Sequence, residues 1–190
     1  MGHSQAAKLA THERIVDIAA KRFREHGIDG VSIADLMNEA GLTAGGFYKH
    51  FESRDQLVKE AFERALRDIE TWENSIPTAP RHAMRVYVSA SHRDNVERGC
   101  PISALVNDMS RATDDTRAIY TEHVRKIVEQ IAKVSPAEDN ASKRAEALHI
   151  LSACVGAVTL SRAVSDEQLS AQLLDGALNG VLELLSSKRK

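Results

Sequence analysis

An all-α fold is predicted for this chain from three observations. Of its 190 residues, 43% are hydrophobic but only 4% are aromatic. Long stretches rich in Ala, Leu, Arg and Glu, which are strong helix formers, fill most of the sequence. Within them, apolar residues recur at the three- and four-residue spacings of amphipathic helices. We expect a small N-terminal helical domain over residues 1–52 and a larger helical domain over residues 53–190.

The charge and the cysteine content exclude several classes of protein. The formal net charge is −2, so the chain is no general nucleic-acid coat, and any DNA binding depends on local cations. Two cysteines without metal-ligand spacing predict no zinc site, no other cofactor and no disulfide framework, and they fit a reducing cytoplasm. No apolar run approaches the roughly 20 residues that span a membrane, and the N-terminus lacks signal-peptide character.

The first expected element is an amphipathic helix over residues 11–26, preceded by a loose arm over residues 1–10. Ile15 and Phe23 belong to its inward face, because they fall at helical spacing. Gly27 ends the helix, since glycine adopts the left-handed conformation that follows many helices.

Two short helices joined by a tight turn come next. Ser32 is a good N-cap, and Asp35 three residues later completes a sequence like a capping box. Gly41 stops this helix, and Thr43 caps a second one that ends near His50. This pattern predicts a helix-turn-helix unit, whose second helix enters the major groove of DNA.

The composition of the second helix also favours DNA binding. Gly45 and Gly46 lie in its first turn, where each costs roughly 1 kcal/mol relative to alanine. A helix that approaches another backbone closely has a use for glycine, because the Cβ is missing. Tyr48, Lys49 and His50 add a hydroxyl and cationic groups to the same helix, whereas a purely structural hairpin has no obvious need of them.

These residues carry a resemblance to a known family. Gly41 to Leu57, read as Gly-Leu-Thr-Ala-Gly-Gly-Phe-Tyr-Lys-His-Phe-Glu-Ser-Arg-Asp-Gln-Leu, is similar to the recognition-helix signature of the tetracycline-repressor (TetR) family. Phe23 to Ile33 resembles the first helix and turn of that family, and the match covers roughly residues 13–61. Arg54 stands where the family usually has lysine, so the positive charge is kept.

The chemistry and the resemblance together suggest a role for each residue. Thr43 and Lys49 are candidates for base edges, whereas Ser32 and Arg54 are better suited to phosphates, as are Tyr48 and His50. The candidate DNA-contacting residues are Ser32, Thr43, Ala44, Gly45, Gly46, Tyr48, Lys49, His50 and Arg54.

The rest of the chain is expected to form longer helices. Ser53 and Gln56 make a second capping box, Pro77 and Pro80 interrupt the helical pattern, and Cys100 lies at a sharp Gly-Cys-Pro boundary. The expected helices span residues 53–74, 81–97, 102–112, 114–134, 141–164 and 167–187.

The last two helices predict a homodimer. Each is apolar over more than one face, which exceeds what a surface helix needs, and small residues allow close packing. Twofold packing into a four-helix bundle would bury these faces and would match a pseudo-palindromic site on double-stranded DNA. The candidate interface residues are Cys154, Gly156, Ala157, Leu160, Leu174, Ala177, Leu178 and Val181.

The resemblance implies that the C-terminal domain holds a small-molecule effector, which most often relieves repression. Apolar side chains with a few polar groups among them favour an apolar or aromatic effector, although ordinary core packing explains each residue singly. The candidate pocket residues are Trp72, Met84, Tyr87, Val88, His92, Cys100, Leu105, Met109, Tyr120 and His123.

Two alternatives remain beside an effector-released repressor. Cys100 follows Gly99 at a helix start with Arg98 nearby, features that favour a thiolate and a redox-controlled repressor; a small buried residue closing a turn is the other interpretation. The chain could also be a helical small-molecule-binding module without DNA specificity. An enzyme is not expected, because the sequence has no nucleophile motif, no metal-ligand spacing and no phosphate-binding loop.

Overall fold

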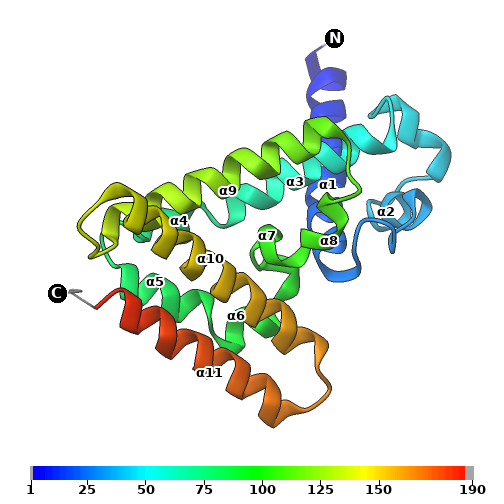
Figure 1. The fold of residues 1–190 in the computed structure, drawn as a ribbon. Coiled ribbons are helices and arrows are strands. Elements are labelled where there is room, and N and C mark those ends of the chain that lie inside the picture. Colours follow the sequence, from blue (N-terminus) through cyan, green and yellow to red (C-terminus); the bar gives the residue numbers. More distant parts are fainter. Residues whose placement is uncertain (1, 187–190) are drawn as a thin grey trace. The chain divides into compact units, whose positions relative to one another are not determined.

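The computed structural model describes residues 2–186, and every regular element in that range is a helix (Figure 1). The predicted all-α class is therefore confirmed. The elements are α1 (Gly2–His26), α2 (Ile33–Glu39), the 3₁₀ helix η1 (Ala44–Lys49), α3 (Arg54–Asp68), α4 (Glu70–Ser75), α5 (Pro80–Tyr87), α6 (Ala90–Asp94), the 3₁₀ helix η2 (Val96–Arg98), α7 (Pro101–Ala104), α8 (Val106–Met109), α9 (Asp114–Val134), α10 (Asn140–Ala163) and α11 (Glu167–Leu184).

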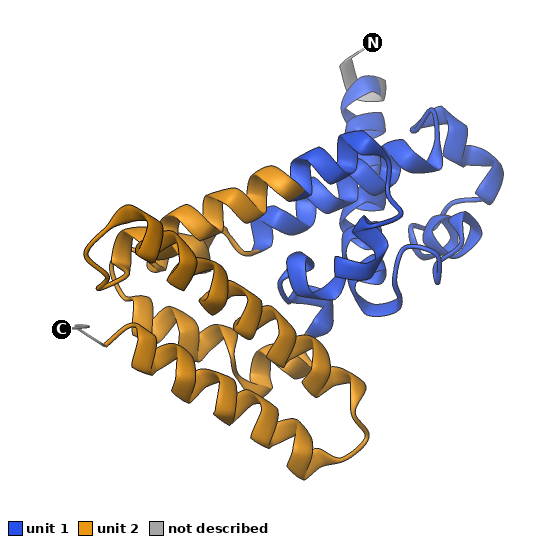
Figure 2. Ribbon diagram, viewed as in Figure 1, with its two compact units in different colours: residues 1–68, 96–120 blue, residues 69–95, 121–190 orange. Residues whose placement is uncertain are grey.

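The described chain divides into two compact units, coloured separately in Figure 2. Unit 1 comprises the chain up to residue 68 together with residues 96–120, and unit 2 comprises residues 69–95 and the chain from residue 121 onward. The expected boundary between residues 52 and 53 is a functional division, and it stays a prediction. The compact units are divided elsewhere, because α3 packs along α1 and the segment 96–120 joins them.

The core of unit 1 forms where α1 and α3 pack together and α2 and η1 close over one side. Its fully buried side chains are apolar and lie at the helical spacings seen in the sequence. They include Ile15, Ala19, Phe23, Leu36, Met37, Phe47, Phe51, Leu57, Ala61 and Phe62.

One cation is buried beside this core. The Arg24 guanidinium donates to Asp68 Oδ2 at 2.7 Å and to the Gly99 carbonyl at 3.2 Å, and so ties α1 to α3 and to the segment after η2. Burial raises the pKa of Asp68, but hydrogen bonds from Arg24 and Arg64 outweigh it and hold that pKa below its usual value. The ion pair therefore stays charged across the ordinary pH range.

In unit 2, α10 and α11 pack along one another, with α6 against α10 and α5 against α11 (Figure 1). The shared interior is apolar and contains Ile76, Ala83, Met84, Tyr87, Ile127, Ile131, Ala147, Ile150, Cys154, Val158, Leu174 and Val181. Among the described residues, no helix is sufficiently long and apolar to cross a membrane.

The first helix is longer than the sequence analysis expects. Residues 2–10, expected as an arm, are the opening turns of α1. The physical reason is that Gln5 to Ala10 consists of good helix formers with no glycine or proline to stop the helix, so it extends toward the N-terminus. Met1 lies outside the described residues, as do the last four residues of the expected 53–190 domain.

Three other expected helices are shorter than predicted. The helix over 53–74 is interrupted at Ile69, 81–97 becomes α5, α6 and η2, and 102–112 becomes α7 and α8. Val88, with φ −92° and ψ 70°, ends α5, and the Ser89 hydroxyl then caps α6 by accepting the His92 N–H at 3.1 Å. The expectations for α9, α10 and the start of α11 agree with the structure.

Candidate nucleic-acid interface

The first helix of the predicted helix-turn-helix is fixed by its cap. The Asp35 N–H donates to Ser32 Oγ at 3.1 Å, and the Ser32 N–H donates to Asp35 Oδ2 at 3.4 Å. This reciprocal arrangement is a complete capping box, as the sequence predicts. It fixes the start of α2 while leaving Ser32 itself exposed.

The turn depends on the backbone conformation of Gly41. Its φ is 72°, in the left-handed region that glycine adopts without steric cost. A Cβ added there would meet no atom within 4 Å, so conformation alone, rather than space, calls for glycine. The following Leu42 N–H donates to the Met37 carbonyl at 2.8 Å, which closes the end of α2 and directs the chain into η1.

The recognition element is a short 3₁₀ helix rather than the expected α-helix. Thr43 precedes it in an extended conformation, but its side chain makes no capping hydrogen bond; the Gly46 N–H donates to the Thr43 carbonyl instead. Two buried rings, Phe47 and Phe51, lie 5.2 Å apart between centroids and hold η1 against unit 1. With only one inward anchor of its own, η1 has most of its surface free for contact.

Outward-facing residues gather on this element. Tyr48 is 75% exposed, and Lys49, Thr43, Ala44 and Gly45 are exposed as well. The structure thus brings together, on one short helix, the hydroxyl, ammonium and backbone groups that the sequence singles out. A hydroxyl and a lysine side by side can reach both phosphates and base edges.

The two glycines of η1 have no reason for being glycine inside the protomer. A Cβ at Gly45 would meet nothing within 4 Å, and one at Gly46 would make an ordinary 3.6 Å contact with Met37. Alanine would fit at both positions and would favour a helix. Close approach of an external partner is the remaining physical advantage of glycine here.

Arg54, which is expected to contact a phosphate, makes hydrogen bonds within unit 1. One guanidinium nitrogen donates to the carbonyls of Ile28 and Val31, at 2.5 and 2.7 Å, and Cζ lies 5.8 Å from the centroid of the Phe23 ring. The charge therefore fixes the loop that precedes Ser32. Arg54 thus supports the helix-turn-helix from within unit 1, and its expected contact with a phosphate stays a prediction.

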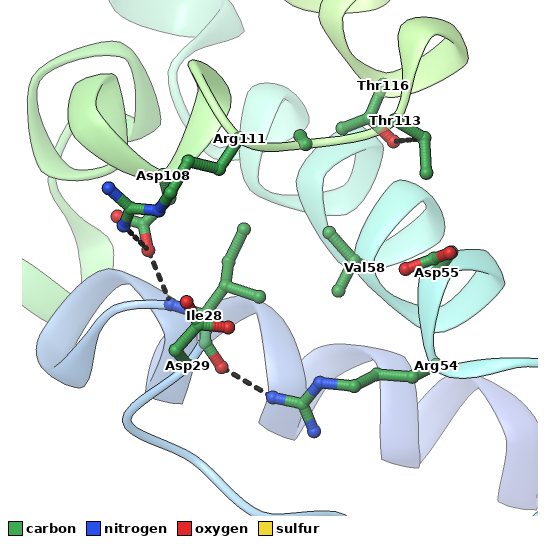
Figure 3. A pocket seen from close by; sticks show the side chains of 10 residues that line it. Ile28, Asp29, Arg54, Asp55, Val58, Asp108, Arg111, Thr113 and Thr116 are labelled. Carbon is green, nitrogen blue, oxygen red and sulfur yellow. Dashed lines mark hydrogen bonds and ion pairs between the residues drawn. The ribbon is translucent and has the colours of Figure 1, made fainter.

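Behind this loop lies a polar cavity of about 320 Å³, all of it within unit 1 (Figure 3). Asp108, from α8, accepts the Ile28 N–H at 3.0 Å and lies 3.9 Å from Arg111. Gly27, with φ 75°, brings the loop close to this carboxylate. The segment 96–120 is thereby hydrogen-bonded to the loop between α1 and α2, a contact that the sequence did not predict.

His50 differs from its exposed neighbours. It is half-buried, and its Nδ1 is buried without a hydrogen-bond partner. Burial lowers its pKa, and the positive charges of His12, Lys8 and Lys49 lower it further. The lowered pKa favours the neutral form of His50, and its expected contact with a phosphate stays a prediction.

The ten predicted pocket residues are divided between the two units. Cys100, Leu105, Met109 and Tyr120 belong to unit 1, and Trp72, Met84, Tyr87, Val88, His92 and His123 belong to unit 2. The six in unit 2 include an aromatic cluster, with the Tyr87 ring 4.8 Å from Trp72 and 4.6 Å from His92. A single effector cavity stays a prediction.

His123 belongs to a buried ion cluster that the sequence analysis missed. Glu73 is fully buried and accepts hydrogen bonds from His123 Nε2 and, at 2.9 Å, from Lys126 Nζ. Burial raises the pKa of Glu73, but these two partners outweigh it and bring the pKa below its usual value. His123 and Lys126 lie three positions apart on α9, so their side chains are neighbours on the same side of the helix. That spacing could have signalled a shared partner.

Four of the predicted dimer residues face the interior of their own protomer. Cys154, Ala157, Leu174 and Val181 are buried in unit 2, because they lie on the sides of α10 and α11 that face its core. They pack in the protomer core, and a place for them in a dimer interface stays a prediction. Gly156, Ala177 and Leu178 are partly exposed, and Leu160 is 53% exposed.

The two cysteines are both buried. Cys100 precedes the four-residue helix α7, and burial limits the access of an oxidant to it. Burial also raises the pKa of Cys154 to about 12, so that thiol is inert packing. Within the described residues, no three metal-ligating side chains gather into a site.

The sequence matches to known proteins lie mainly in the part of the chain that contains the helix-turn-helix. The family model described as bacterial regulatory proteins, tetR family, matches residues 15–61. Over 64 residues the chain is 31% identical to the HTH-type transcriptional repressor KstR2 of Rhodococcus jostii, covering 34% of this chain and 31% of that protein. Over 131 residues it is 28% identical to the HTH-type transcriptional repressor DhaR of a Mycobacterium species, covering 67% of this chain and 64% of that protein. The chain thus matches about a third of the first relative's length and just under two thirds of the second's.

Solved structures match nearly the whole chain. A TetR transcriptional regulator from Chloroflexus aurantiacus superposes with a TM-score of 0.77 at 24% identity, covering 96% of this chain and 97% of that one. A TetR-family regulator from Cytophaga hutchinsonii gives a TM-score of 0.77 at 18% identity, covering 97% and 98%. At these identities the likeness concerns the fold.

Proposed function

We propose that the chain is a transcriptional regulator of the tetR family rather than an enzyme, and that it represses transcription in the cytoplasm by binding operator DNA as a homodimer. A small, largely apolar effector in the C-terminal helices releases it. The recognition surface is η1 with its flanks, in which Thr43 and Lys49 read base edges while Tyr48 and Ser32 contact phosphates. The observation that carries this proposal is the exposure of these groups on a helix whose glycines have no internal purpose.

The dimer part of the proposal rests on an apolar face that the protomer leaves open. Leu148 and Leu160 of α10 and Leu169 of α11 are 46%, 53% and 42% exposed. Added Cβ atoms at Gly156, Gly176 and Gly180 would all meet open space. Helical glycine costs roughly 1 kcal/mol, and close packing against another helix compensates for that cost. A second copy, related by a twofold axis, fits such a face.

The effector part rests on the aromatic cluster of unit 2. Trp72 donates its indole N–H to the Ala83 carbonyl at 2.8 Å, so its ring is fixed beside Tyr87. His92 Nδ1 lies 2.6 Å from the Tyr87 carbonyl oxygen, which orients the imidazole next to the same ring. Rigid aromatic surfaces with few polar groups favour an apolar or aromatic ligand. Its effect on DNA affinity is limited to its differential affinity for the two conformations.

Thiol control through Cys100 is the weaker candidate, because that side chain is buried. Replacing Cys100 by serine distinguishes the two. An effector-released repressor keeps its response to ligand and has no oxidant response to lose, whereas a redox-controlled repressor loses its oxidant response and keeps DNA binding.

Selection of binders from random double-stranded DNA tests the proposal. A dimeric regulator enriches a motif of two inverted half-sites about one helical turn apart. Sedimentation of Leu160→Glu, with Val86→Glu as a matched exposed position on α5, tests the dimer: the first variant is expected to become monomeric and the second to stay dimeric. Failure to enrich any motif would contradict specific DNA binding, and a monomeric wild-type protein would contradict the dimer.

A further inference from the structure

A histidine of α1 joins the end of the recognition helix to α3. His12 Nε2 lies 2.5 Å from Glu60 Oε2, and its Nδ1 lies 3.2 Å from the backbone carbonyl oxygen of His50. The imidazole also stacks on the Phe51 ring, with centroids 4.4 Å apart. The helix α1, the residue that follows η1 and the helix α3 thus meet at one side chain, which neither the sequence pattern nor the family comparison singled out.

The two contacts can both be hydrogen bonds only with a particular number of protons at this site. A carbonyl oxygen and a carboxylate oxygen are both acceptors, whereas a neutral imidazole has only one N–H to donate. Either His12 carries protons on both nitrogens, or the Glu60 carboxyl is protonated and donates to Nε2. In both cases the His12–Glu60 pair holds one proton more than a neutral ring beside a carboxylate would. Loss of that proton leaves a ring-nitrogen lone pair facing an acceptor oxygen, either the Glu60 carboxylate or the His50 carbonyl.

We propose that His12 is a protonation-dependent positioning residue, whose protonated pair with Glu60 holds the His50 carbonyl and with it the end of η1. The inference rests on the proposed DNA-binding function and adds its regulation by pH. When the pair loses its proton, one of the two contacts breaks and the recognition helix loses its tie to α1 and α3. Operator affinity therefore falls as the pH rises through the range in which this proton is lost.

The surroundings fix the carboxylate in place and leave the pair open to solvent. Gln56 of α3 donates to the other Glu60 oxygen at 2.9 Å and so fixes the carboxylate, while Lys8 lies one turn before His12 on α1. His12 is 23% exposed at its side chain and lines an open cavity of about 570 Å³, so protons exchange with solvent. The neighbouring His50 has a lowered pKa, chiefly through burial, and gains its proton only at lower pH.

The test measures fluorescence anisotropy on a selected operator duplex between pH 6 and 9 at constant ionic strength. Wild-type affinity is expected to fall about tenfold, the size of one charge-assisted hydrogen bond. In Glu60→Gln the amide N–H₂ donates to unprotonated Nε2, so neutral His12 keeps both contacts and affinity stays high across the range. In His12→Phe the ring still stacks on Phe51 but both hydrogen bonds are gone, so affinity is low throughout.

Two matched variants separate this effect from charge alone. Glu63→Gln removes the same charge from an exposed position of α3, and His26→Gln removes an exposed histidine from the end of α1. Both are expected to keep the wild-type pH slope. A wild-type slope in Glu60→Gln or in His12→Phe would overturn the inference.

A readout without DNA keeps the inference separate from the proposed function. At the acid end of the series, the ¹⁵N resonances of His12 in the wild type are expected to show Nδ1 protonated and a proton shared between Nε2 and Glu60, whereas in Glu60→Gln Nδ1 is protonated and Nε2 is not. A wild-type Nδ1 without a proton contradicts the inference. A wild-type Nε2 without a shared proton contradicts the inference even if the protein binds DNA. Conversely, failure of the wild type to bind any duplex, with the shared proton present, contradicts only the proposed function.

Discussion

The recognition segment, Ser32–Phe51, and the connecting segment, Pro80–Met109, are both built from short helices, but different forces set their ends. In the recognition segment a capping box begins α2 and a left-handed glycine, Gly41, ends it. In the connecting segment α5 ends at Val88 and α7 at Leu105, buried residues with negative φ. In the recognition segment, a cap and a glycine close in sequence set where α2 begins and ends. In the connecting segment, α5 and α7 end at residues that are buried in the core.

The largest effect is expected where the recognition segment does depend on burial. Phe47 is its buried anchor, and Phe47→Ala should cost about 3–5 kcal/mol of unfolding free energy. The neighbouring Tyr48→Ala should change stability by less than about 0.5 kcal/mol, because Tyr48 is exposed, while it weakens DNA binding. Urea unfolding measures the stability of both variants. Equal losses of stability in Phe47→Ala and Tyr48→Ala would contradict the role of Phe47 as the buried anchor.

The next effect concerns the buried ion cluster of unit 2. Glu73→Gln should cost about 2 kcal/mol, because Lys126 and His123 lose their shared counter-charge. The folded pKa of Glu73 lies below its ordinary 4.5, so its contribution is complete above that value and is lost as pH falls through the lower folded pKa. Urea unfolding from pH 7 to 3 measures this; the exposed Glu122→Gln on α9 is the control and should show little change at pH 7.

Alanine substitutions at two glycines of the recognition segment should change the stability of the protein in opposite directions. Gly41→Ala forces a left-handed alanine and should cost about 1–2 kcal/mol. Gly45→Ala meets open space in a helical turn and should stabilise the protein by up to about 1 kcal/mol, while it weakens DNA binding by blocking close approach. Thermal melts and anisotropy measure the two effects; unchanged DNA affinity in Gly45→Ala would contradict the proposed role of that glycine.

The smallest effect tests the connecting segment. Ser89 caps α6, so Ser89→Ala should cost about 1 kcal/mol. Ser91→Ala, two residues later in the same helix and exposed, should be near neutral. Equal melting temperatures for the two variants would contradict the role of the Ser89 cap in starting α6 after Val88.

The recognition segment was predictable because its signals are local. Ser32, Asp35, Gly41, Phe47 and Phe51 each act within a few residues, and their roles in the structure match those expected from the sequence. The outward face of η1 followed from the same residues, although its 3₁₀ form did not.

Most of the failures involve long-range partners. The sequence could not show that Arg54 reaches the Ile28 carbonyl, that Glu73 is buried against α9, or that His12 meets Glu60. Which apolar side of α10 faces inward depends on α11 and α6, so buried Cys154 and exposed Leu160 looked equivalent in the sequence. In the connecting segment, Ser89 was a readable cap that helical periodicity obscured.

The most direct test of the central claim is anisotropy on the selected operator duplex with Lys49→Ala and Lys133→Ala at one moderate salt concentration. Both remove one exposed lysine, the first from η1 in unit 1 and the second from the last turn of α9 in unit 2. If η1 is the recognition element, Lys49→Ala should lose about tenfold or more in affinity, and Lys133→Ala should bind like the wild type. Equal affinities for the two variants would contradict the assignment of the DNA-binding surface to η1.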